Sequence, residues 1–163
     1  MASKLPYVNH MKAFGLGIVI AVIGIVAYLQ FAPSGPDELP DVTVYQNPTC
    51  ECCTDWGEYM KEQGFEVEYE VVESTQPVRE DLGIPEALGS CHTAVMGDYV
   101  VEGHVPSEDV KRMLMDDRDI RGLAVPGMPV GSPGMERGDR VDAYNVIAFN
   151  EQGQTEVYAQ YGQ

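Results

Sequence analysis

The sequence has few basic side chains and no basic run longer than Lys111-Arg112. Its 163 residues carry 10 Lys and Arg against 26 Asp and Glu, a formal net charge of −16. A nucleic-acid-binding protein needs clustered basic residues to displace counterions from phosphates, so the composition excludes a nucleic-acid partner. The hydrophobic content of 44% also excludes a disordered acidic tail, which lacks the apolar side chains to form a core.

Acidic residues are absent from residues 1–36, which contain Lys4 and Lys12, and all 26 acids lie in residues 37–163. Residues 13–32 are apolar except for one glutamine and three glycines. A helix of about 20 apolar residues crosses the hydrocarbon layer of a bilayer. This segment therefore predicts a transmembrane anchor or uncleaved signal, behind which the acidic part of the chain folds separately.

The basic flank of the anchor predicts its orientation, because positive charges near a span stay in the cytoplasm. We expect residues 1–12 to be cytoplasmic and the protein to be a single-pass inner-membrane protein. Its C-terminal domain would lie in the periplasm or an equivalent extracytoplasmic space. A cleaved signal peptide is the alternative, disfavoured by the length of the apolar core and by Pro33 at the only plausible cleavage junction.

A short linker over residues 33–40, stiffened by three prolines, precedes a domain over residues 41–163. Hydrophobic periodicity and turn residues predict an α/β domain with the element order β-α-β-α-β-β-α and a C-terminal hairpin. This is the order of a thioredoxin-like domain. The predicted elements are strands 42–45, 65–72, 93–96 and 99–102, helices 53–63 and 77–82, a helix from Ser107, and hairpin strands 144–150 and 155–161.

Three of the four cysteines, Cys50, Cys52 and Cys53, lie within four residues at the predicted first strand-to-helix turn. Unpaired N–H groups at a helix N-terminus favour thiolate over thiol, and thiolates exchange disulfides or bind soft metals. A disulfide between Cys50 and Cys53 is the alternative role for that pair, because an exported chain meets an oxidising environment. For Cys52 the alternative is a small buried apolar group.

The hairpin over residues 93–102 predicts where Cys91 lies. With Gly97-Asp98 as a two-residue turn, Thr93 faces Glu102, and counting outward places Cys91 opposite His104. In a thioredoxin-like sheet this segment lies beside the C-x-x-C turn and normally carries a cis proline, whereas this chain has Ser90-Cys91-His92-Thr93. We therefore expect six side chains to converge at one end of the sheet: Cys50, Cys52, Cys53, Cys91, His92 and His104.

These six side chains also have other interpretations. Cys91 can serve only in a disulfide, for instance with Cys52, and each histidine can be a hydrogen-bonded structural residue. The Gly- and Pro-rich segment from Gly122 to Gly138 is predicted to be a loop, and one of this length is usually functional or disordered. Met128 and Met135 lie in it as second-tier candidate ligands, although methionine also fills gaps in packing.

The softness of these donors predicts the metal. Thiolates with imidazoles suit Cu(I) and Zn, and thioethers prefer Cu(I). A zinc site typically has two spaced pairs of ligands, whereas three adjacent thiols suit several Cu(I) ions bridged by thiolates. Copper, as Cu(I), is therefore the predicted metal.

Four sequence blocks resemble the CopG-type copper-resistance proteins, a family also labelled as metal-binding or uncharacterised-domain proteins. The blocks are T-V-Y-x-N-P-T-C-x-C-C-x-x-W (43–56), S-C-H-T-A (90–94), E-G-H-V-P (102–106) and G-L-A-V-P-G-M-P-x-G-S-P-G-M-E (122–136). The resemblance implies a thioredoxin-like fold, export and copper binding through the cysteine cluster. Glu51 stands where many relatives have glycine, which adds a carboxylate near the site.

Two functions follow from these observations. The first is a membrane-tethered copper-binding protein that sequesters the metal or exchanges it with donor or efflux proteins in metal resistance. The second is an enzyme, a thiol–disulfide or copper oxidoreductase, suggested by the C-x-x-C pair at a helix N-terminus. Against the enzyme are the missing cis proline and the third thiol, so a metal-binding protein is favoured.

Overall fold

The computed structural model describes residues 39–116 and 118–163. The predicted cytoplasmic N-terminus, the predicted anchor over 13–32 and the linker up to residue 38 lie outside these residues. No helix within the described ranges is both long and apolar enough to cross a membrane.

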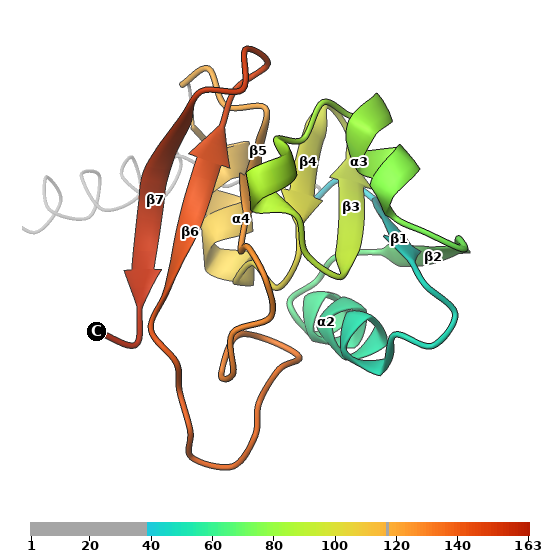
Figure 1. Cartoon of the computed structure of the whole chain (residues 1–163), viewed down its shortest axis with the longest axis vertical. Coiled ribbons are helices and arrows are strands. Elements are labelled where there is room, and N and C mark those ends of the chain that lie inside the picture. Colours follow the sequence, from blue (N-terminus) through green and yellow to red (C-terminus); the bar gives the residue numbers. More distant parts are fainter. Residues whose placement is uncertain (1–38, 117) are drawn as a thin grey trace, which may run out of the picture. The chain divides into compact units, whose positions relative to one another are not determined.

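The described residues form a mixed α/β fold around one seven-stranded sheet with the strand order β2-β1-β3-β4-β5-β6-β7 (Figure 1). The strands are β1 (Val42–Gln46), β2 (Val67–Val71), β3 (His92–Met96), β4 (Tyr99–Glu102), β5 (Gly122–Ala124), β6 (Tyr144–Phe149) and β7 (Thr155–Tyr161). The helices are α2 (Glu51–Glu62), α3 (Gln76–Asp81) and α4 (Ser107–Leu114), with a 3₁₀ turn, η1 (Glu86–Leu88).

The hairpin that positions Cys91 has the predicted register. β3 and β4 pair antiparallel, with Met96 opposite Tyr99 and Thr93 opposite Glu102. Gly97 adopts a φ of 58°, which the two-residue turn requires and which glycine reaches without steric cost. β1 pairs parallel with β2 and antiparallel with β3. The C-terminal end of β1, the start of β3 and the end of β4 therefore lie at the same end of the sheet.

The prediction of a loop over the whole of residues 122–138 is wrong at its start. Gly122–Ala124 forms β5, which pairs parallel with β4 and antiparallel with β6. Three residues beginning with glycine have little intrinsic strand preference, so partners on both sides decide this strand. Through β5, the predicted C-terminal hairpin joins the same sheet.

Other boundaries shift by a few residues. α2 begins at Glu51, two residues before the predicted start, with Cys50 as its N-cap, and it ends before Gly64, whose φ is 95°. β2 is shorter than predicted, because Phe65 turns into the core before the strand begins. Val71, the last residue of the edge strand β2, is 62% exposed.

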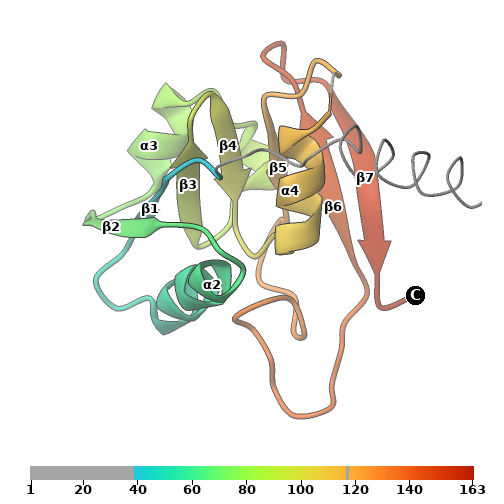
Figure 2. The same cartoon turned by 180° about the vertical axis from the view of Figure 1, so that it is seen from behind.

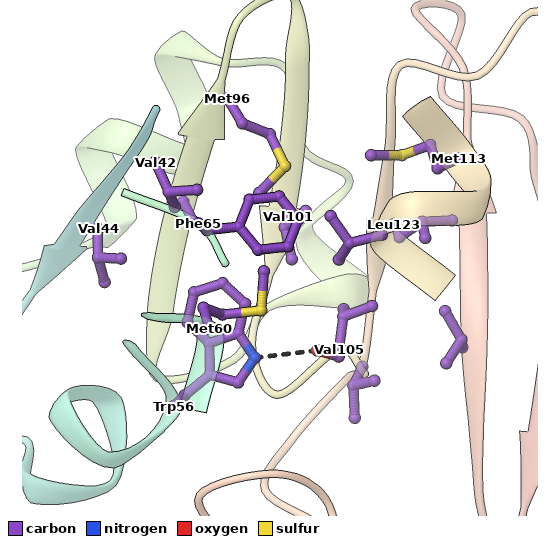
Figure 3. Packing of buried hydrophobic residues seen from close by; sticks show 14 of the residues in the cluster. Val42, Val44, Trp56, Met60, Phe65, Met96, Val101, Val105, Met113 and Leu123 are labelled. Atoms are coloured by element: carbon purple, nitrogen blue, oxygen red, sulfur yellow. Dashed lines mark hydrogen bonds between the residues drawn. The ribbon is translucent and has the colours of Figure 1, made fainter. Parts of the chain in front are cut away.

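Both faces of the sheet carry an apolar core, as alternation along the strands requires. On one face Trp56 and Met60 of α2 belong to the same apolar cluster as Met113 of α4 (Figures 2 and 3). On the other face, Ile84 and Leu88 pack against the sheet. The second core contains Val100, Ala124 and Phe149, whereas their neighbours Val101, Leu123 and Ala148 belong to the first. Packing on both faces holds in place the end of the sheet at which the cysteines lie.

Candidate metal centre

The six predicted donor residues come from three chain segments at one end of the sheet. Cys50, Cys52 and Cys53 cap and open α2 directly after β1. Cys91 and His92 stand where β3 begins, and His104 follows β4. The donor atoms form two groups, each with all members within 4.8 Å of one another: the four cysteines, and Cys91 with both histidines. The structure thus brings all six residues together, with Cys91 common to both groups.

The cysteines are in two states. Cys50 and Cys53 form a disulfide, and Cys52 and Cys91 are free. The pair expected to supply two thiolates therefore has, in this structure, the alternative role of a disulfide. Cys52 Sγ lies 3.7 Å from Cys50 Sγ and 4.0 Å from Cys91 Sγ. All four sulfurs become available to a metal once the disulfide is reduced.

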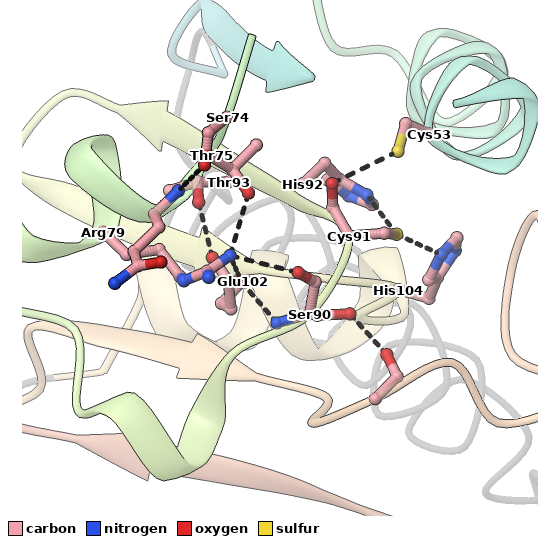
Figure 4. A network of polar contacts seen from close by, with 12 residues as sticks. Cys53, Ser74, Thr75, Arg79, Ser90, Cys91, His92, Thr93, Glu102 and His104 are labelled. Carbon is pink, nitrogen blue, oxygen red and sulfur yellow. Dashed lines mark hydrogen bonds and ion pairs between the residues drawn. The ribbon is translucent and has the colours of Figure 1, made fainter. Parts of the chain in front are cut away.

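Cys91 is flanked by both imidazoles. Its Sγ lies 3.1 Å from His104 Nε2 and 3.4 Å from His92 Nδ1 (Figure 4). Burial and, to a smaller extent, the neighbouring Cys52 raise the pKa of the Cys91 thiol to about 12. Cys91 is therefore a protonated thiol at neutral pH, and a metal that binds its sulfur must displace that proton.

The long loop determines which nitrogen of His104 is free. His104 Nδ1 lies 2.8 Å from the Pro133 carbonyl oxygen. A carbonyl only accepts hydrogen bonds, so Nδ1 carries the proton and Nε2 presents its lone pair to Cys91. Histidines that bind metals characteristically donate their other N–H to such an acceptor, which fixes the tautomer and the ring orientation.

His92 is completely buried against Trp56, with the two ring centroids 4.7 Å apart. Burial, and to a smaller extent the neighbouring His104, lower the pKa of His92 well below its usual value. Its Nε2 atom is buried and finds no hydrogen-bond partner among the described residues. An unpaired polar nitrogen in a core costs free energy, whereas the nitrogen that faces the Cys91 thiol is Nδ1, which is therefore the candidate donor for a soft metal.

The loop also approaches the cysteine helix at Gly134. Gly134 has a φ of 79°, and a Cβ atom there would lie 2.7 Å from Trp56 N and 3.1 Å from the Cys52 carbonyl oxygen. Only glycine allows this approach, which carries the adjacent Pro133 to His104. Met128 is 55% exposed, and the surface cavity that it lines contains no cysteine or histidine. Met135 is half-buried, and metal ligation by either methionine stays a prediction.

Sequence reasoning missed several residues that shape the site. Glu102 is fully buried beside the Cys91 segment, and Arg79 of α3 reaches it. Trp56 of α2 donates from Nε1 to the Val105 carbonyl and packs on His92. The predicted register, which places Glu102 opposite Thr93 inside a buried hairpin, was a signal that could have drawn attention to this carboxylate.

The chain is similar in sequence and fold to known proteins. A family model described as "Protein of unknown function, DUF411" matches residues 88–135, which include Cys91, His92 and His104. Two solved structures, "Copper resistance protein copG- Form 2" and "Copper resistance protein copG- Form 1", are 45% and 44% identical to this chain. They cover 76% and 77% of it, while 99% and 100% of their own lengths are covered, with TM-scores of 0.72 and 0.73. No curated protein matches the chain significantly.

Proposed function

Because this chain belongs to the CopG family of copper resistance proteins, we propose that it binds copper, as Cu(I), through its cysteine–histidine cluster and sequesters or hands over the metal. The position of Cys91 is the observation that carries the proposal, because its sulfur belongs to both groups of donor atoms. A thiolate can bridge two Cu(I) ions, so one residue can join the thiol-rich part of the site to the imidazoles. The donor set is soft, as Cu(I) prefers.

Two features of the histidines support binding. The lone pair of His104 Nε2 already faces Cys91, and the Pro133 carbonyl holds the ring in that orientation. His92 Nδ1 also faces this sulfur, 3.4 Å from Cys91 Sγ. Both rings are held neutral by burial, which lowers their pKa values, and neutral imidazole is the form that binds metals. Each imidazole thus already presents one nitrogen to the Cys91 sulfur.

The redox state of the cysteines sets the capacity of the site. With the Cys50–Cys53 disulfide intact, Cys52, Cys91 and the two imidazoles are available. Two-electron reduction by a dithiol adds two more thiols at the start of α2. The reduced chain therefore binds more copper than the oxidised chain.

We further propose that the domain is thioredoxin-like. Its support is the strand order β2-β1-β3-β4, with β1 and β2 parallel and the other two pairs antiparallel. The C-x-x-C pair lies at the start of the helix that follows β1.

We also propose that residues 13–32 anchor the domain to the inner membrane with the cluster in the periplasm. The apolar length and basic flank of that segment support this, as does the Cys50–Cys53 disulfide, which persists in oxidising compartments. There the domain would exchange copper with donor or efflux proteins.

Metal analysis of the full-length chain tests copper binding. The chain is purified in detergent, reduced with dithiothreitol, freed of reductant under anaerobic conditions and loaded with Cu(I). We expect more than one copper per chain, and a large loss in the double variant Cys52→Ser plus Cys91→Ser. Met115→Leu, at a methionine that is 58% exposed, is the matched control for a soft side chain outside the cluster. Near-zero retention, or retention unchanged by the double variant, would overturn the proposal.

The second candidate function is a thiol–disulfide or copper oxidoreductase, favoured by the disulfide at the start of α2 with the free Cys52 sulfur 3.7 Å from Cys50 Sγ. A thiolate at that distance can attack a disulfide. Disulfide reduction by the metal-free protein, at a turnover comparable to that of a thioredoxin, would make catalysis the primary function. Turnover that appears only with copper would indicate redox chemistry on the metal.

A further inference from the structure

A buried carboxylate lies beside the cluster without belonging to it. Glu102, at the end of β4, is fully buried. One of its oxygens accepts a hydrogen bond from Thr93 Oγ1 and the other from the Ser90 backbone N–H, each at 2.6 Å (Figure 4). Arg79 of α3 is 3.5 Å away. Burying a carboxylate is costly unless its oxygens are paired, and here both oxygens are paired.

The residue that this carboxylate holds is Ser90, the neighbour of Cys91. Three polar groups of Ser90 are bound by three different segments. Its N–H donates to Glu102, its carbonyl accepts from Arg79 Nη1 at 3.1 Å, and its hydroxyl donates to the Gly127 carbonyl. Arg79 also donates to Thr75 Oγ1 at 2.9 Å, which ties the guanidinium to the start of α3.

The approach of Ser90 to β4 also depends on Gly103. A Cβ atom at Gly103 would lie 2.6 Å from Ser90 Cβ and 2.7 Å from the Val125 carbonyl oxygen. The φ of Gly103 is 72°, a conformation that other residues rarely adopt. The chain between Glu102 and His104 is therefore shaped to admit Ser90.

This anchoring has a consequence for the thiol. The peptide bond is planar, so holding the Ser90 carbonyl largely fixes the Cα position of Cys91 and leaves its side-chain torsion as the main freedom. The Cys91 sulfur must lie 3.1 Å from His104 Nε2 and 4.0 Å from Cys52 Sγ at once. Small shifts of the Ser90 backbone would break that placement.

We propose that Glu102 and Arg79 are positioning residues that hold Ser90 and thereby place the Cys91 thiol between Cys52 and the histidines. The inference concerns thiol placement, and it rests on the proposed copper-binding function only for its effect on copper affinity. Glutamine at position 102 would keep the size of the side chain but has only one acceptor oxygen. In one orientation of the amide the Ser90 N–H would lose its acceptor. In the other the NH2 group would face Thr93, whose hydroxyl would have to accept instead of donate. In both orientations Arg79 would lose its charged partner.

The test compares Glu102→Gln with a matched control, Asp109→Asn, in the full-length chain in detergent. Asp109 is also a buried carboxylate, 1% exposed, and it also pairs with an arginine, Arg112, and a hydroxyl, that of Tyr161. It lies in α4, outside both groups of donor atoms.

Two readouts are taken on the reduced chain: the ratio of alkylation rates of Cys91 and Cys52 in the metal-free protein, and the Cu(I) affinity by competition with a chromogenic chelator. Unfolding midpoints are measured alongside, because both substitutions lower stability.

We expect Glu102→Gln to raise the alkylation of Cys91 relative to Cys52 and to weaken Cu(I) binding by roughly tenfold to a hundredfold. Asp109→Asn should leave both readouts at wild-type values. If Glu102→Gln does not fold, Arg79→Gln at a partly exposed position removes the hydrogen bond to the Ser90 carbonyl and serves in its place.

The positioning role is overturned if the variant keeps the wild-type alkylation ratio, or if Asp109→Asn changes the ratio equally. A wild-type chain that binds no Cu(I) would refute the proposed function instead, and the alkylation ratio would still decide the role of Glu102 and Arg79.

Discussion

His104 Nε2 lies 3.1 Å from Cys91 Sγ, across the open end of the β3–β4 hairpin. The Pro133 carbonyl, from the long loop, fixes the tautomer that makes this contact productive. One hairpin and one loop thus place a thiol against a neutral imidazole lone pair before any metal is present. Substitutions at this contact and in the loop therefore test copper binding and fold stability separately.

His104→Ala should lower Cu(I) affinity by about tenfold to a hundredfold, because it removes a donor nitrogen and the group that the Pro133 carbonyl orients. Competition with a Cu(I) chelator measures the change. Ser107→Ala is the control, since Ser107 is also buried and follows closely in the chain but bonds to Tyr59. Equal affinities in the two variants would show that His104 is not a ligand.

Gly134→Ala should destabilise the fold more than Gly138→Ala. Both glycines have positive φ, but a Cβ atom at Gly134 meets the backbone of Trp56, whereas at Gly138 it meets nothing within 4 Å. Overpacking against backbone costs about 1–3 kcal/mol beyond the shared conformational strain. Urea unfolding of both variants gives the difference. Equal losses would mean that the loop does not pack on α2 as closely as the structure has it.

Acid should destabilise the metal-free protein below the ordinary histidine pKa of about 6.5. Burial lowers the pKa values of His92 and His104 in the folded state, so the unfolded chain binds more protons in acid. Their contribution to stability is therefore complete above that value and is lost as the pH falls, at up to about 1.4 kcal/mol per pH unit for each residue.

The measurement is the slope of unfolding free energy between about pH 7.5 and 5.5. Burial raises the pKa values of Glu102 and Asp109, and their contribution is lost as pH rises, which opposes the histidines. The slope is therefore compared between wild type and His92→Gln, in which it should be shallower. Identical slopes would rule out a buried neutral His92.

Trp56 should report on copper at His92. It is the single tryptophan of the chain, and its ring centroid lies 4.7 Å from that of His92. Cu(I) bound to the imidazole would change the electronic environment of the indole, so its emission should fall as the site fills. A fluorescence titration measures this, with His92→Gln as the control that should respond less. Unchanged emission with copper bound would exclude His92 as a ligand.

Much of the fold was predictable because local signals and tertiary packing agree. The Gly97-Asp98 turn set the register of the hairpin, and that register alone brought Cys91 opposite His104. β5 could not be predicted, because Gly122–Ala124 has no strand pattern of its own and pairs only because β4 and β6 flank it. Sequence spacing identified the candidate donor residues, such as Cys91 and His104. It did not identify the residues that orient them, such as Glu102 and Pro133.

The sequence by itself predicted the candidate donor residues and a soft metal, and it determined the end of the sheet at which these residues meet, because turn chemistry and periodicity are local properties. Only the tertiary structure decided that Cys50 and Cys53 form a disulfide, that Pro133 selects the His104 tautomer and that Glu102 holds Ser90. Most of these contacts join residues distant in the chain, and a shift of a few tenths of an ångström decides which atoms become partners. Such distances are set by packing, which no local pattern encodes.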